Sequence, residues 1–182
     1  MAVSTYKWTI DKWHELVDSG VLDGQKVELL EGEIIDMSPE GIPHRNTSHE
    51  TAKYLRKLLG ESAEVYEAHP ITLDNSEPEP DIAIVRSPST IYRDRHPYEK
   101  DIYWLIEVAN RSLKKDLEQK TITYARNNIP EYWVIDLVNR KLIVHINPYE
   151  DKYLQIDEYK SGAIAPQAFP KIKISLERIF LY

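Results

Sequence analysis

Glu107 is the side chain best placed for chemistry, because it is the one charged residue in the apolar run 102–109. Such a run is typical of a central strand that is covered on both faces. An ionised carboxylate is costly to bury there unless a cation or hydrogen-bond donors meet it. A structural salt bridge would explain a lone buried glutamate equally well, so the neighbouring residues must decide.

Asp81 is a second acid in a comparable place, directly after Pro80 and at the start of the apolar run 82–85. Two adjacent strands could bring Asp81 and Glu107 to one point, where they would repel each other unless a cation lay between them. Mg²⁺ suits such a pair, since it accepts one or two carboxylates together with water and a substrate phosphate. Taken alone, Asp81 is equally typical of a loop or capping residue.

Lys120 is the third candidate, because it falls inside the apolar stripe of a helix predicted over Leu113–Asn127. On a helical wheel it lies within about 40° of Tyr124, with Asp116 at the edge of the stripe. This helix follows the Glu107 strand and must pack back on the sheet, so Lys120 is predicted to point at the two acids. The alternative is a lysine that keeps its charged head in water.

Glu28 and His44 are weaker candidates. Glu28 lies in a hairpin predicted from the strands 26–30 and 33–37, on the side of Leu30, where glutamates are usually solvated. His44 begins the inward face of a helix predicted to end at Leu59. It could donate a hydrogen bond or carry a proton, although a capping role or a core contact would suit it as well.

Two acids, a lysine and a divalent cation fit the hydrolysis of a phosphodiester. The metal neutralises the phosphate and lowers the pKa of its water, while the lysine orients that water or stabilises the pentacovalent charge. The sequence has no Gly-rich phosphate loop, H-E-x-x-H, G-x-S-x-G or dinucleotide-binding motif. Two other classes stay open: a nucleic-acid-binding or interaction module without turnover, and a sugar hydrolase that uses the carboxylate pair.

The composition is that of a globular protein, with 182 residues, 42% hydrophobic and 29% charged. One domain over residues 1–182 is expected. It would comprise an N-terminal helix and hairpin over 1–43, a core over 44–137, and C-terminal strands and an extension over 138–182. The absence of cysteine excludes disulfides, thiolate nucleophiles and zinc knuckles. With no apolar run of membrane length and no export signal, a soluble cytoplasmic protein is predicted.

The net charge of −7 argues against general affinity for nucleic acid, but the charge is uneven. Residues 1–80 carry 7 basic and 16 acidic side chains, whereas residues 81–182 carry 16 and 14. We therefore expect modest, salt-sensitive DNA binding at a local basic face within residues 86–126.

The element order that positions these residues begins with a helix over residues 10–18 and the hairpin. The helix 44–59 follows, then a strand over 64–73 that is interrupted near Pro70, strands over 82–85 and 102–109, and a loop over 86–101 between these two. After the Lys120 helix come strands over 131–137 and 141–146. A mixed α/β fold with helices packed against a central sheet is predicted.

A series of motifs occurs in an order that resembles a known family. They are Val27-Glu-Leu-Leu-Glu-Gly-Glu-Ile34, Met37-Ser-Pro39, Pro80-Asp81, Leu105-Ile-Glu-Val108, Asp116-Leu-Glu-Gln-Lys120, Tyr124-Ala125 and Ile129-Pro-Glu-Tyr-Trp-Val-Ile-Asp136. Over about residues 10–146 the chain resembles the Uma-type putative restriction endonuclease family of the PD-(D/E)XK nuclease superfamily. The block 105–136 is the most specific part.

This resemblance implies a restriction-endonuclease-like αβββαβ core and a Mg²⁺-dependent endodeoxyribonuclease, with Mn²⁺ as a substitute. Independently of the resemblance, a homodimer stays open as the assembly, because symmetric dimers are the commonest and cutting both DNA strands would favour one. The resemblance makes Asp81 and Glu107 the metal ligands and lets Glu28 join them. The superfamily's lysine should stand two residues after Glu107, where this chain has Ala109. Lys120 is the predicted replacement, and together with Tyr124 it resembles a helix motif that some relatives place beside the site.

Overall fold

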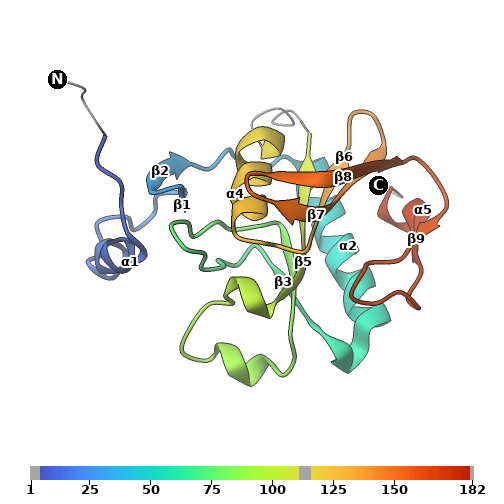
Figure 1. Ribbon diagram of the computed structural model, residues 1–182, viewed down its shortest axis with the longest axis horizontal. Coiled ribbons are helices and arrows are strands. Elements are labelled where there is room, and N and C mark those ends of the chain that lie inside the picture. The colour runs from blue at the N-terminus through green and yellow to red at the C-terminus, as the bar shows by residue number, and fades with distance from the viewer. Residues whose placement is uncertain (1–4, 111–115, 181–182) are drawn as a thin grey trace.

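The centre of the molecule is a six-stranded sheet, seen in a computed structural model that describes residues 5–110 and 116–180 (Figure 1). Its strand order is β3-β4-β5-β6-β7-β8. These strands are β3 (Glu64–Glu67), β4 (Ile82–Val85), β5 (Ile102–Ala109), β6 (Glu131–Asp136), β7 (Lys141–Tyr149) and β8 (Lys152–Tyr159). Only β5 and β6 pair in parallel, whereas the other neighbours are antiparallel. A mixed sheet of this kind confirms the predicted fold class.

Helices pack on both faces of this sheet (Figure 1). They are α2 (Ile42–Leu59) and α5 (Leu176–Ile179) on one face and α4 (Thr121–Arg126) on the other, whereas α1 (Ile10–Asp18) lies away from this sheet. Leu55 of α2 lies in one core with Trp104, and Tyr124 of α4 lies in the other with Leu105. Since successive side chains of a strand point to opposite faces, this explains why β5 is apolar almost throughout. None of the described helices has both the length and the apolar content to cross a bilayer.

The N-terminal part forms as predicted. Helix α1 begins after Thr9, whose side-chain oxygen accepts a hydrogen bond from the Lys12 N–H at 3.4 Å. The hairpin pairs β1 (Val27–Leu30) with β2 (Glu33–Asp36). It turns at Glu31 and Gly32, which both have positive φ, as a tight hairpin turn requires.

The strand predicted over 64–73 is shorter than expected, because β3 ends at Glu67, before the interruption predicted near Pro70, and does not resume. Ala68 adopts a left-handed φ of 51°, which no regular strand accommodates. Beyond it, the Ile71 N–H donates to the Pro78 carbonyl, so the chain folds back on itself instead of continuing along the sheet.

The remaining elements differ from the prediction mainly in length. Helix α2 begins at Ile42, two residues early, and β7 extends to Tyr149. The predicted loop 86–101 contains two 3₁₀ turns, Ser89–Tyr92 and Glu99–Asp101. The described part of the predicted Lys120 helix is a π-helical turn, Asp116–Lys120, followed by α4, and its earlier residues lie outside the described ranges. The last small elements are β9 (Ala163–Ile164) and β10 (Ile174–Ser175), which pair with each other.

Candidate active site

The antiparallel pair of β4 and β5 brings Asp81 and Glu107 together. Ile82 of β4 lies opposite Ile106 of β5, so Asp81, directly before Ile82, and Glu107, directly after Ile106, are neighbours across the two strands. The Asp81 carboxylate is fixed there, because its Oδ2 accepts a 2.6 Å hydrogen bond from the Val108 N–H. The structure thus unites the two acids predicted to hold a metal.

Lys120 and Tyr124 both end on the Glu107 carboxylate. The Lys120 ammonium and the Tyr124 hydroxyl each donate to Oε1 of Glu107 at 2.9 Å. Lys120 is only 6% exposed and Glu107 only 5%, so the lysine head lies inside the protein and not in water. Within the described part of the chain, no hydrogen bond reaches the second oxygen of Glu107, Oε2.

Glu28 is also buried and is not a solvated hairpin residue. Its Oε2 lies 3.6 Å from the Lys120 ammonium and accepts a 3.2 Å hydrogen bond from the Glu79 N–H. Lys120 therefore lies between two carboxylates, one from β1 and one from β5. Glu79 is a half-buried acid that the sequence analysis did not single out.

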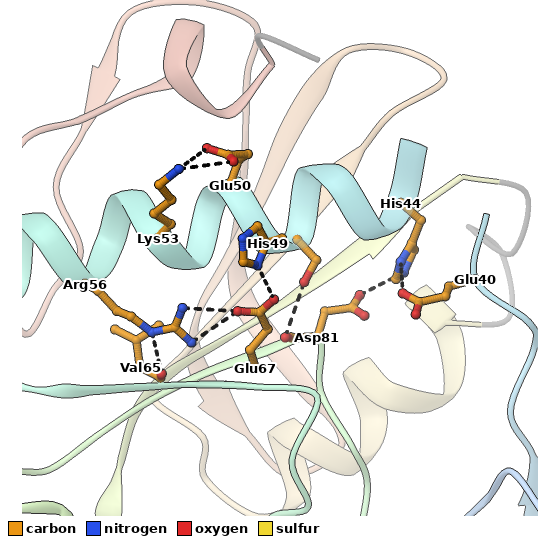
Figure 2. Close-up of polar contacts among 10 residues, drawn as sticks. Glu40, His44, His49, Glu50, Lys53, Arg56, Val65, Glu67 and Asp81 are labelled. Atoms are coloured by element: carbon orange, nitrogen blue, oxygen red, sulfur yellow. Dashed lines mark hydrogen bonds and ion pairs between the residues drawn. The ribbon is translucent and has the colours of Figure 1, made fainter. Parts of the chain in front are cut away.

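His44 approaches Asp81 from the opposite side, at the start of α2 (Figure 2). Its Nε2 lies 3.1 Å from Asp81 Oδ2, and its Nδ1 lies 3.5 Å from Glu40 Oε2. Further along the helix, His49 and Arg56 both contact the Glu67 carboxylate on β3. These contacts fix α2 over the strand end that carries Asp81.

These side chains line a cleft of about 840 Å³. Its acidic and basic lining residues are Lys26, Glu28, Asp36, Glu40, His44, Glu79, Asp81, Glu107 and Lys120. A second pocket of about 550 Å³ shares Lys26 and Glu40 with the cleft and adds Arg45. The cleft therefore carries a clear excess of acidic over basic side chains.

The crowding of acids shifts their pKa values. Burial raises the pKa of Glu107, and repulsion from Asp81 adds to the rise, although Lys120 opposes it. Burial alone would lower the pKa of Lys120, but the carboxylates of Glu107 and Glu28 outweigh it and raise that pKa. Burial and repulsion from Glu28 likewise raise the pKa of Glu79. The lysine thus stays charged among acids that gain from further positive charge.

The pKa values of His44 and Tyr124 are also raised. Burial alone would lower the pKa of His44. Its hydrogen bond with Asp81 and the negative charges of the nearby carboxylates outweigh burial and raise that pKa. For Tyr124 burial is the main cause, and the Glu107 charge adds to it. Tyr124 therefore remains a protonated donor to Glu107.

The donor set fits a magnesium ion. No three acidic or histidine side chains among the described residues form a complete metal-binding group. Mg²⁺ does not need one, since it commonly binds to one or two carboxylates and keeps several waters. Asp81 Oδ1 and Glu107 Oε2 accept no hydrogen bond within the described ranges, so each acid has an oxygen to offer.

Ala109 stands where a lysine was expected and is fully buried. It packs in the same core as Tyr124 and Ala125 of α4, so the helix covers the strand at this position. Lys120, on the π-helical turn before α4, brings its ammonium to Glu107 instead. Asp116 belongs to that turn, but its side chain lies outside the described part of the structure.

Comparisons with known proteins agree with this architecture. A family model described as Uma2, putative restriction endonuclease, matches residues 12–177. Among solved structures, the chain is similar to a putative nuclease belonging to DUF820 from Anabaena variabilis ATCC 29413. The TM-score is 0.69 at 16% identity, over 85% of this chain and 89% of that one, which shows a shared fold. A search of curated proteins gives no significant match.

Proposed function

The chain belongs to the Uma2 putative restriction endonuclease family, and from this premise we propose that it hydrolyses DNA phosphodiester bonds with Mg²⁺, or Mn²⁺ in its place. Family membership supports a nuclease-like function. The observation that carries the proposal is the buried Lys120–Glu107 pair, which lies beside Asp81 in an acidic cleft. An inward lysine with acids on both sides suits an anionic substrate held through a divalent cation.

The roles of the side chains follow from their contacts. Asp81 and Glu107 would hold the metal through the oxygens that no hydrogen bond uses. When bound, Mg²⁺ supplies charge neutralisation at the phosphate and a water of lowered pKa. Lys120, fixed by Glu107 and Glu28, stabilises the negative charge that develops at phosphorus. Tyr124 holds the Glu107 carboxylate in place, so it acts as a positioning residue.

His44 would act on the other side of Asp81, as a hydrogen-bond donor to the substrate or to Asp81. The mouth of the cleft adds Lys26 and, in the adjoining pocket, Arg45. Neither is in an ion pair with another residue of the described ranges, so both are available to phosphates. Salt should weaken such contacts, because they replace counterions along the nucleic acid.

The direct test is a cleavage assay on supercoiled, linear and single-stranded DNA, and on RNA, with Mg²⁺ or Mn²⁺. We expect DNA to be cut, and we expect EDTA or Asp81→Asn to abolish cutting. Asparagine keeps an oxygen for the Val108 N–H, so this variant should fold. Cleavage of RNA alone would contradict the DNA substrate, and activity that survives EDTA would contradict the metal.

A non-catalytic nucleic-acid-binding module is the competing function, and Ala109 is the feature that favours it. Lys120→Ala separates the two, because an enzyme would lose rate and keep binding, whereas a module has no rate to lose. The single domain over 1–182, the homodimer and the cytoplasmic location stay predictions of the sequence.

A further inference from the structure

Helix α2 has the largest excess of positive charge among the described helices. It contains four basic side chains and one acidic side chain, Glu50, whereas α1 contains one basic and three acidic side chains. The loop 86–101, for comparison, contains four basic and three acidic side chains, and its Arg95 is paired with Asp101 at 2.6 Å. On a chain with a net charge of −7, the concentration of positive charge on α2 is unusual.

The basic side chains of α2 lie on its solvent side and form one stripe. They are Arg45, Lys53, Arg56 and Lys57. All four are exposed, whereas Leu55 and the other buried residues of the helix face the sheet. At about 100° per residue the four fall within about 120° of arc. We call them the basic stripe of α2.

Three of these four cations have little compensation within the chain. Arg45 and Lys57 form no ion pair with another described residue. The side chain of Lys53 is 67% exposed and has one contact, at 3.4 Å, with a neighbouring carboxylate of the helix. Arg56 differs, because both of its terminal nitrogens donate to the Glu67 carboxylate of β3 at 3.1 Å (Figure 2). The first three are therefore available to an external anion.

The basic stripe of α2 starts at the cleft and has the scale of a nucleic-acid backbone. Pro43 and His44, in the first turn of α2, line the cleft, and Arg45 lines the adjoining pocket. At 1.5 Å per residue, Arg45 and Lys57 lie about 18 Å apart along the helix, which equals about five steps of a duplex at 3.4 Å each. A rigid row of cations of this length suits the stiff backbone of a DNA duplex.

We propose that the basic stripe of α2 binds the phosphates of duplex DNA beside the segment that enters the cleft, an inference that rests on the proposed function. Charge supports this partner, since the stripe is cationic whereas the cleft is acidic. Proteins that bind single strands use aromatic side chains as stacking platforms, and none of the exposed side chains of α2 is Tyr, Trp or Phe. The stripe then supplies affinity that does not depend on sequence.

The salt dependence of binding tests the inference, because each phosphate contact to B-DNA contributes about −0.9 to the slope of log K against log salt concentration. Binding of a fluorescently labelled DNA duplex to the full chain is followed by anisotropy in EDTA, which prevents metal-dependent cutting. In the double variant Lys53→Gln, Lys57→Gln we expect the slope to fall in magnitude by about two, and the affinity to fall by more than about tenfold at about 0.1 M salt. Arg45→Gln alone should lower the slope by about one.

The double variant Lys152→Gln, Lys160→Gln is the matched control. It removes the same charge from two exposed lysines in and directly after β8, which lies at the opposite edge of the sheet from β3. Its slope and affinity should stay close to those of the wild-type chain. Glutamine is a good helix former, so α2 should persist in the test variant, and thermal melting verifies the fold of both.

Equal slopes in the two double variants would overturn the inference, as would tighter binding of single-stranded DNA or of an RNA duplex than of duplex DNA. This failure is distinct from a failure of the proposed function. A chain that cuts DNA but shows equal slopes lacks only the surface on α2. A chain that binds duplex DNA through α2 but cuts none keeps this surface and loses the proposed hydrolysis.

Discussion

Glu107 and Glu131 are buried acids on neighbouring strands, yet their surroundings differ. The two oxygens of Glu131 accept one hydrogen bond each, from the Trp133 indole at 2.6 Å and the Gln167 N–H at 2.7 Å. Both bonds to Glu107 end on one oxygen, and one of the donors is a cation. Burial alone therefore does not distinguish the two acids, whereas an unused oxygen beside a buried cation sets Glu107 apart and supports the role proposed for it.

The causes of the pKa shifts at Glu107 and Glu131 also differ. Burial raises the pKa of both carboxyls. At Glu131 neutral donors, Trp133 and Gln167, oppose the rise. At Glu107 other acids, Asp81 and Glu28, add to it. A cation entering the cleft would relieve this repulsion, and Glu131 offers no comparable gain.

Substitution by glutamine should change a different property at each acid: the cleavage rate at Glu107 and the stability of the fold at Glu131. The loss of cleavage rate in Glu107→Gln is the largest effect that we expect. Glu107→Gln keeps an oxygen for Lys120 and Tyr124, so the fold should persist. Removal of a metal-binding charge should lower the cleavage rate by more than about 1000-fold. Cleavage kinetics and thermal melting, measured on each variant, check both statements.

Glu131→Gln is the matched control. It turns one acceptor into an NH₂ group that faces a donor, which should cost about 1–3 kcal/mol of unfolding free energy. The cleavage rate of the folded protein should not change. If Glu131→Gln abolished cleavage while Glu107→Gln left it intact, the distinction between the two acids would be wrong.

Lys120→Met removes the cation that distinguishes the two sites. The rate should fall by about 100-fold, because charge in the transition state loses a preorganised partner. DNA binding should persist, and unfolding should become easier by about 3 kcal/mol, since Glu107 loses its buried partner. Kinetics, binding titrations and denaturant melts measure the three effects.

Lys7→Met is the control for this ion pair. Lys7 and Glu33 are about half exposed, so the loss of their contact should cost less than about 1 kcal/mol. Equal losses of unfolding free energy in Lys7→Met and Lys120→Met would show that burial does not increase the contribution of the Lys120 ion pair to stability.

The smallest effect is expected at Tyr124, where Tyr124→Phe removes one of the two donors to Glu107. Cleavage should slow by less than about tenfold, the equivalent of one hydrogen bond. The control is Tyr153→Phe, which removes a 3.0 Å hydrogen bond to the Ile129 carbonyl and should cost about 1 kcal/mol without a change in rate. A rate loss confined to Tyr153→Phe would contradict the assignment of Tyr124.

Local periodicity predicted much of the fold, because most elements carry a strong pattern of their own. The apolar run of β5 and the N-cap residue Thr9 of α1 are signals of this kind. An interruption near Pro70 was predicted, but the earlier end of β3 at Ala68 was not, since it depends on a backbone conformation that no residue type there demands. Nor was the extent of β8, whose apolar residues point to solvent.

The candidate site was accessible to sequence reasoning where one element sets the direction of a side chain. The helical wheel placed Lys120 and Tyr124 on one side, and both meet Glu107. Glu79 was missed because its backbone contact with Glu28 joins a loop to a hairpin 51 positions away. Contacts of this range follow from tertiary packing, which no local pattern reports.

Calorimetric titration of Mn²⁺ into the wild-type chain, Asp81→Ala and Glu107→Ala tests the central claim most directly. We predict one binding event that both substitutions remove and that Glu131→Gln retains, since Asp81 and Glu107 would share a single metal. Mn²⁺ binding that is unchanged in both alanine variants would contradict the account, because it would place the metal away from the two carboxylates.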